Sequence, residues 1–151
     1  MSLVPLLPEQ GLVRVIYASR WGACVREDLY HIARAIVARS AQRNAETGIT
    51  GLLLVHGGWF VQALEGEAAQ VRALFATIAA DPRHFDIEVL ASGQADHRLF
   101  ADWAMAERRL SPVDQRLLEQ IGQAEKFTPA QLDAERALLL MTAAGQLAEA
   151  A

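Results

Sequence analysis

Residues 49–66 read ITGLLLVHGGWFVQALEG, which is two apolar runs joined by a Gly-Gly pair. Such a pair favours a tight β-hairpin, because the turn needs a positive φ at both central residues. Gln62 interrupts the second run, and Tyr17 interrupts the apolar run Leu12–Ser19 in the same way. On a pleated strand Gln62 shares a face with its apolar second neighbours, so its amide is expected in the core. An unpaired polar group there costs about 1–3 kcal/mol, so the two residues indicate that something polar lies in the core with them.

The remaining elements are predicted outward from this hairpin. Apolar periodicity predicts a helix over Asp28–Asn44 that Gly48 ends, and a second helix after Gly66 that closes near Asp81-Pro82. Strands are predicted over Leu12–Ser19, Ile49–Val55, Trp59–Leu64, Phe85–Ala91 and Phe100–Glu107. The order β-α-β-β-α-β with a fifth strand is that of an α+β, ferredoxin-like sheet. We expect its first and third strands to form a parallel central pair that aims Tyr17 and Gln62 between the two helices.

Two further helices are predicted at the C-terminal end. Ser111-Pro112 has Pro at a first helical position, and Thr128–Gln131 has the spacing of a capping box. Both hairpin strands are apolar on both faces, so both faces of the sheet need cover. The C-terminal helices are expected to bury Leu117, Ile121, Leu139 and Leu140 on the face that the first two helices leave open. The chain is therefore divided into a domain over 1–110 and a helical cap over 111–151.

Composition and charge exclude several classes of protein. The 151 residues are 52% hydrophobic and 21% charged, which is typical of a globular domain. A net charge of −4 gives no electrostatic surface for nucleic acid, and no apolar run is long enough to span a membrane. Cys24 is the only cysteine and no secretory signal is apparent, so a reducing, cytoplasmic location is expected. The four histidines lack ligand spacing, and no metal site is expected.

Five short motifs occur in order along the chain. They are Ile16–Ser19, Gly48–Leu53 with Asn44 before it, Phe60–Gly66, Asp81–His84 and Trp103–Met105. In order and spacing they resemble the BLUF domains, the flavin-binding receptors of blue light, over about Leu12 to Leu110. The C-terminal helices are then an appendage of the kind usual in short, stand-alone bacterial members.

The resemblance implies a bound flavin, FAD with FMN or riboflavin as alternatives, between the first two helices and the sheet. Tyr17 matches the electron-donating tyrosine, and Gln62 matches the glutamine between that phenol and the flavin. Asn44 matches the asparagine that hydrogen-bonds the polar edge of the ring, and Trp103 and Met105 match the signalling pair of the fifth strand. The chemistry is consistent, because a glutamine amide can accept from a phenol and donate to a flavin.

Other residues have less specific roles. Arg83, with Asp81 nearby, is a candidate for the phosphate or ribityl chain, and Ser40, one turn before Asn44, could reach the cofactor. Arg43 and Thr77 depart from the family pattern, and Thr77 stands where some relatives carry a basic residue. Each residue taken alone also has a structural interpretation, as core packing, a helix end or a solvated charge. Trp59 is predicted to be an exposed or half-buried surface aromatic.

The predicted function is a blue-light photoreceptor in which a Tyr17–Gln62–flavin hydrogen-bond switch signals through protein–protein contacts. No catalytic motif is apparent, so an enzyme is not expected, and the partners are an unnamed downstream protein and further copies in a dimer or larger oligomer. Two alternatives stay open. One is a ferredoxin-like interaction module without flavin, and the other is a small hydrolase resembling acylphosphatase, since the fold hosts both.

Overall fold

The computed structural model describes residues 7–21, 42–81, 84–101, 106–109, 115–123 and 125–150. Four of the predicted site residues lie outside these ranges: Ser40, Arg83, Trp103 and Met105. Most of the predicted helix Asp28–Asn44 also lies outside them. Its end is described, since residues 42–47 are helical and Gly48, at φ 74°, follows them as predicted.

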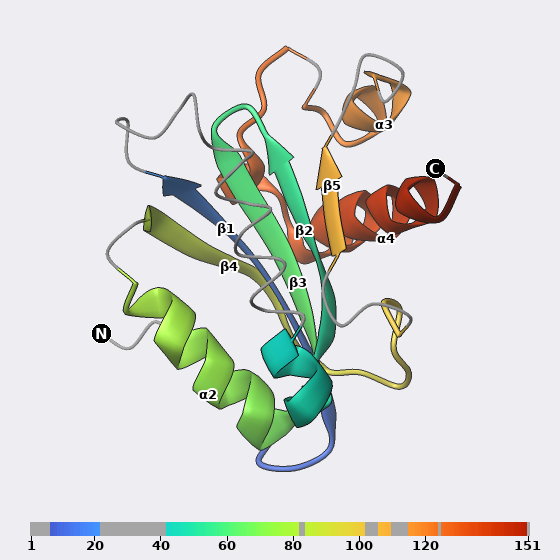
Figure 1. The fold of residues 1–151 in the computed structure, drawn as a ribbon. Helices are drawn as coiled ribbons and strands as arrows, with labels where there is room; N and C mark the ends of the chain where they lie inside the picture. The colour runs from blue at the N-terminus through green and yellow to red at the C-terminus, as the bar shows by residue number, and fades with distance from the viewer. Residues whose placement is uncertain are drawn as a thin grey trace.

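A five-stranded sheet forms the centre of the molecule, in the order β4-β1-β3-β2-β5 (Figure 1). Its strands are β1 (Leu12–Trp21), β2 (Thr50–His56), β3 (Trp59–Glu67), β4 (His84–Gln94) and β5 (Ala106–Arg109). The Gly57-Gly58 turn has φ values of 59° and 82° and joins β2 to β3, which confirms the predicted hairpin. The architecture is the predicted α+β, ferredoxin-like arrangement with a fifth strand.

The central strands β1 and β3 run antiparallel, so the predicted parallel pairing is wrong. The path of the chain explains the direction. A βαβ crossover makes β1 and β2 parallel, and the tight hairpin reverses β3 against β2. Since β3 lies between them, it is antiparallel to both. The prediction that β1 and β3 are neighbours is confirmed, and Tyr17 is directly opposite Gln62.

The last strand is shorter and later than predicted. The prediction placed it over Phe100–Glu107, whereas β5 covers Ala106–Arg109 and pairs in parallel with β2. Phe100 lies in a turn before the strand and is buried there. Its backbone N–H donates to the Glu65 carboxylate, 2.8 Å away, instead of to a neighbouring strand. Phe100 is therefore a buried apolar residue of a loop, and its apolar character alone led to the prediction of a strand.

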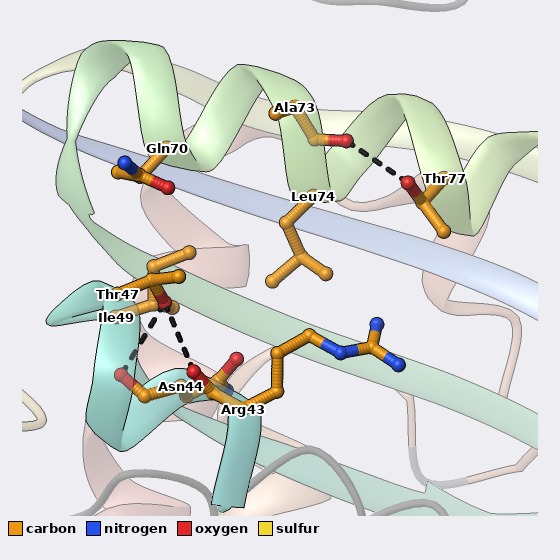
Figure 2. Close-up of a pocket in the computed structure, with 8 residues that line it drawn as sticks. All are labelled: Arg43, Asn44, Thr47, Ile49, Gln70, Ala73, Leu74 and Thr77. Atoms are coloured by element: carbon orange, nitrogen blue, oxygen red, sulfur yellow. Dashed lines mark hydrogen bonds between the residues drawn. The ribbon is translucent and has the colours of Figure 1, made fainter.

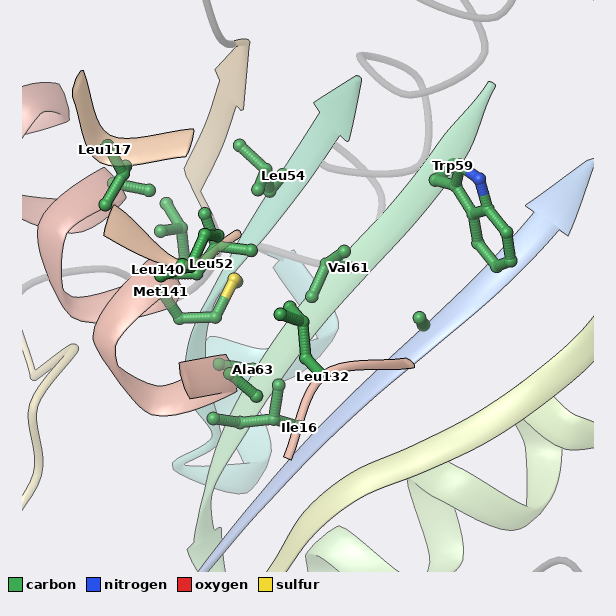
Figure 3. Close-up of a cluster of buried hydrophobic side chains, with 14 of the residues drawn as sticks. Ile16, Leu52, Leu54, Trp59, Val61, Ala63, Leu117, Leu132, Leu140 and Met141 are labelled. Carbon is green, nitrogen blue, oxygen red and sulfur yellow. The ribbon is translucent and has the colours of Figure 1, made fainter. Parts of the chain in front are cut away.

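Helices cover both faces of the sheet (Figure 1). The segment 42–47 and α2 (Ala68–Ala79) lie on the face that holds Tyr17, where Val15, Leu53, Phe60 and Phe75 are buried with it. The helices α3 (Gln115–Gln120) and α4 (Ala134–Ala150) cover the opposite face, as predicted. Figure 3 shows Leu117, Leu140 and Met141 packed there against strand residues that include Ile16, Leu52 and Val61.

The approach to α4 differs from the prediction. Thr128 precedes a short 3-10 helix, Pro129–Gln131, and its side chain caps nothing. The backbone N–H of Thr128 instead donates to Oε1 of Gln123, at 2.6 Å. The chain is extended at Leu132, and Asp133 then accepts the backbone N–H of Arg136 at 2.8 Å, in the position of an N-cap. The capping box at Thr128 was therefore a wrong prediction.

Leu139 is also misplaced by the sequence pattern. It was predicted to pack against the sheet, but 45% of its surface is exposed. Residues 137, 140, 141 and 144 are the buried ones, at the i, i+3, i+4 and i+7 spacing of one helix face. Leu139 lies off that face. Among the described residues, no helix is long and apolar enough to cross a membrane.

Strand β4 is irregular where it faces the middle of β1. Its register against β1 shifts between Ile16 and Tyr17 and again between Ala18 and Arg20. Asp86 lies within the second irregularity and has a φ of 53°. Such β-bulges bend a strand and are common at sheet edges and beside functional sites.

Candidate functional site

The site begins with a hydrogen bond between two buried residues of the central strands. The Tyr17 hydroxyl donates to Oε1 of Gln62, and the two side chains are only 4% and 5% exposed. They are opposite each other in the β1–β3 register, and opposite residues of an antiparallel pair point to the same face. The polar residues that interrupt the two apolar strands therefore satisfy each other in the core.

The surroundings of Tyr17 keep its phenol neutral. Its ring meets Phe75 of α2 edge to face, with 5.5 Å between the ring centroids and 78° between the planes. Burial raises the pKa of the Tyr17 hydroxyl well above its usual value, and the negative charge of Asp81 raises the pKa further. At neutral pH the hydroxyl is thus a hydrogen-bond donor that still holds its proton. Asp81, predicted as a cofactor residue, acts here on Tyr17 through its charge.

A cleft of about 170 Å³ lies between the 42–47 segment and α2 (Figure 2). Its lining residues come from both helices and from the residue just before β2: Arg43, Asn44, Thr47, Ile49, Gln70, Ala73, Leu74 and Thr77. The Thr47 hydroxyl donates to the carbonyls of Asn44 (3.3 Å) and Arg43 (3.4 Å), and the N–H of Ile49 donates to the Asn44 carbonyl (3.1 Å). These bonds hold the end of the helix so that buried Asn44 lines the cleft.

The two departures from the family pattern, Arg43 and Thr77, both line this cleft. Figure 2 shows the Arg43 guanidinium extending along the cleft, away from Thr47. The Thr77 hydroxyl donates to the Ala73 carbonyl one turn earlier, at 3.2 Å. Arg43 is therefore the cationic side chain that the described part of the cleft offers to an anionic or carbonyl-rich group.

Trp59 does not take part in the site. It was predicted to be exposed or half-buried, but it is only 8% exposed. It belongs to the apolar cluster on the α4 side of the sheet, and the Arg20 guanidinium lies 4.8 Å from its ring centroid. The sheet therefore separates Trp59 from Tyr17, because the two side chains leave it on opposite faces.

Two buried polar residues were given no role by the sequence interpretation. Glu65 is fully buried on β3, and Ser19 is buried on β1, two residues beyond Tyr17. Within the described ranges, the Ser19 hydroxyl has no hydrogen-bond partner. The criterion that found Gln62, a polar side chain inside an apolar strand, applies equally to Glu65 and would have found it.

The residues present fit a flavin. Its ring system is flat and largely apolar with a polar edge of carbonyl and imine groups, so it needs aliphatic walls and a few amide partners. Ile49, Ala73 and Leu74 supply such walls, and the Asn44 amide supplies a donor and an acceptor in the same cleft. Gln62 does not line the cleft, but its amide lies opposite Tyr17 on the face of the sheet that the cleft covers.

Comparisons with known proteins agree with this chemistry. The model of the family described as "Sensors of blue-light using FAD" (BLUF) matches residues 12–106. The chain is 38% identical over 71 residues to the photoactivated adenylate cyclase subunit beta of Euglena gracilis, which is 47% of this chain and only 8% of that protein.

Two solved structures cover most of the chain. The BlsA structure in its photo-activated state has a TM-score of 0.80 at 28% identity and covers 89% of this chain and 94% of its own. BlrB, described as a BLUF protein in its dark state, has a TM-score of 0.67 at 31% identity and covers 92% and 99%. These matches support the photoreceptor over the flavin-free module and the hydrolase. With more than half of its residues matched by the family model, the chain belongs to the BLUF family of flavin-binding blue-light photoreceptors.

Proposed function

We propose that Tyr17 and Gln62 form the light-driven switch of this photoreceptor. The proposal depends on one observation: in the buried core the Tyr17 phenol donates a hydrogen bond to the Gln62 amide oxygen. A flavin, when bound, supplies the absorption of blue light and accepts one electron. Tyr17 is the donor of that electron, and an oxidised phenol is a strong acid. Its proton then moves along the existing bond to Oε1 of Gln62 while Nε2 of Gln62 gives up a proton toward the cofactor, so the amide stays neutral as its tautomer. Return of one electron and one proton to Tyr17 restores the phenol and leaves Gln62 in its second form.

Gln62 is the element with two states. Its amide has an acceptor on one side and donors on the other, so a rotated or tautomeric form presents a different hydrogen-bond pattern to the same neighbours. The free energies of two such forms can be close enough for light to change their populations. A stronger hydrogen bond to a flavin carbonyl is expected to shift the absorption to the red.

The flavin is proposed to be FAD, held by Asn44, Arg43 and the predicted residues Ser40, Asp81 and Arg83. The family description names FAD, and the cleft lined by Arg43 and Asn44 supports a cofactor bound between the helices. Heat release of the flavin followed by chromatography against FAD, FMN and riboflavin standards tests this choice. FMN or riboflavin as the main species would refute it.

Absorption spectra before and after blue light test the switch. The purified chain should carry a flavin and show a reversible red shift. Gln62→Leu should keep the flavin and lose the shift, whereas Gln94→Leu, at an exposed position of β4, should behave as the wild type. A light-induced shift of wild-type size in Gln62→Leu would remove Gln62 from the mechanism.

The output is proposed to pass through protein contacts of the 111–151 cap to a partner protein or to a second copy, with no catalytic unit in these 151 residues. Trp103 and Met105 are proposed to relay the change, because they directly precede β5. The match to nearly the whole length of the BlsA and BlrB structures supports a sensor unit made of the flavin-binding domain and the cap together. A cytoplasmic location remains part of this proposal. Light scattering coupled to size exclusion, in the dark and in light, would detect an oligomer or its rearrangement.

A further inference from the structure

Glu65 is a buried carboxylate that the switch does not use. Its side chain is 0% exposed, and it lies three residues beyond Gln62 on β3, pointing to the opposite face of the sheet. Its oxygens accept the backbone N–H groups of Leu99 (2.8 and 3.0 Å) and Phe100 (2.8 Å), and Nε of Arg14 donates to it at 2.8 Å. A buried charge is tolerated when it is paired and hydrogen-bonded in this way.

The bonds connect one row of the sheet to one loop. Arg14 of β1 and Thr50 of β2 are the register partners of Glu65, so the three residues lie side by side across the sheet. We call them the Glu65 row. Nη1 of Arg98 donates to Oγ1 of Thr50 (2.9 Å) and to the Glu65 carbonyl (3.3 Å), while Nη2 of Arg14 donates to the His97 carbonyl (2.9 Å). Each of the three residues of the row is therefore hydrogen-bonded to the loop 95–101, which follows β4.

The other end of this loop leads to the output side of the molecule. Phe100 is buried in the apolar cluster beneath α3 and α4. A few residues later the chain enters β5, which lies beside β2 (Figure 1). Ala106 of β5 is the register partner of Leu52 on β2. The Glu65 row therefore connects the strand that carries Gln62 with both β5 and the helical cap.

We propose that Glu65 is a positioning residue that transmits the state of Gln62 through the sheet to the loop 95–101. The proposal rests on the proposed function of Gln62. The two side chains are three residues apart on one hydrogen-bonded strand, so a change in the position of β3 at Gln62 moves the carboxylate on the other face. The amides of Leu99 and Phe100 follow, because they are bound to its oxygens. The loop then repositions the start of β5.

Hydrogen exchange on the full, flavin-bound chain tests this inference. The wild type should show a red shift and, at Leu99, Phe100 and 106–109, a difference in exchange between dark and light. Glu65→Gln keeps the size of the side chain but loses the charge that binds Arg14 and both amides. Exchange at Leu99 and Phe100 should then be faster by about tenfold in the dark. The red shift should remain, and the dark–light difference in the loop and β5 should disappear. Glu88→Gln, at an exposed position of β4, is the matched control and should behave as the wild type.

The outcomes separate transmission from simple anchoring. If Glu65→Gln speeds exchange equally in dark and light and leaves their difference unchanged, Glu65 is only an anchor and the inference is wrong. A wild type that shifts to the red without any change at Leu99 or Phe100 overturns it as well. A flavin-bound wild type without a red shift refutes the Gln62 switch and this inference together.

A second variant keeps the test decisive if Glu65→Gln does not fold. Arg98→Met removes the bonds from the loop to Thr50 and to the Glu65 carbonyl but leaves the carboxylate and its partners in place. It should keep the red shift and reduce the dark–light difference at Leu99 and Phe100. A difference of full wild-type size in this variant would count against transmission through the Glu65 row.

Discussion

Replacing Tyr17 by Phe tests the centre of the proposed switch with the smallest possible change. The substitution removes one oxygen atom and keeps the ring that packs edge to face on Phe75. What it takes away is the hydroxyl that donates to Oε1 of Gln62 in the buried core. Gln62 therefore loses its phenolic donor at a position that is only 5% exposed to water.

The expected loss of stability follows from this burial. Removing one partner of a buried hydrogen bond costs about 1–3 kcal/mol, because the other partner keeps its desolvation penalty. For a domain of this size each kcal/mol lowers the melting temperature by about 2–4 °C, so a decrease of about 2–12 °C is expected. Adding Gln62→Leu should recover part of that loss, since the amide that was deprived of its donor is then gone. The coupling energy of the double-mutant cycle should be about 1–2 kcal/mol.

The assay has a thermodynamic and a photochemical part. Denaturation of the wild type, both single variants and the double variant is measured at one fixed excess of flavin, because ligand binding itself raises the apparent stability. The same samples are illuminated with blue light, and Tyr17→Phe should bind flavin without a reversible red shift. Additive free energies within about 0.5 kcal/mol would mean that the Tyr17–Gln62 bond contributes nothing. A normal photocycle in Tyr17→Phe would show that another residue donates the electron.

Three further outcomes are expected. Truncation after Leu110 removes helices whose apolar burial contributes stability on the order of 10 kcal/mol, so most of the protein should aggregate. Any soluble fraction isolated by size exclusion should still bind flavin and shift its absorption to the red. Ser19→Ala removes a buried hydroxyl that has no hydrogen-bond partner within the described ranges. Urea denaturation should show that the free energy of unfolding rises by about 1–2 kcal/mol. A lower free energy of unfolding would mean that flavin or another group binds this hydroxyl. Because burial raises the pKa of Tyr17 when folded, its contribution to stability is complete below the unfolded pKa of about 10 and is lost as the pH rises above it. Tyr17→Phe should accordingly lose less stability than the wild type between about pH 9 and 11, and equal losses would contradict this.

The fold and the core of the site could be predicted because both depend on local patterns. Alternation along the strands identified Tyr17 and Gln62 as polar groups in the core, and the Gly57-Gly58 pair identified the hairpin, independently of any distant contact. The parallel direction assigned to β1 and β3 was wrong because adjacency and direction are separate properties. Direction follows from tracing the chain through the crossover and then the hairpin.

The errors arise where the local pattern allows several answers. Leu138, Leu139 and Leu140 are consecutive, and only one of them can lie at the centre of a helix face, so the sequence could not tell that Leu139 is the exposed one. Trp59 follows a turn, where aromatic residues are often exposed, but here the fold brings it against the α4 side of the sheet. The backbone partners of Glu65 are 34 and 35 residues away in the loop 95–101 and its Arg14 partner is 51 residues away, and no local periodicity encodes them.

The two edges of the sheet also bear on how copies of this protein can associate. An edge strand exposes unpaired backbone groups that can pair with another chain, and proteins prevent this with bulges, short strands and charged residues. At one edge, β4 has two register shifts and the positive φ of Asp86. At the other, β5 covers four residues, of which Glu107, Arg108 and Arg109 are charged. Neither edge is a good template for adding a strand, so copies that associate would have to pack through side chains on the helical faces. The same features should protect the protein from β-type aggregation.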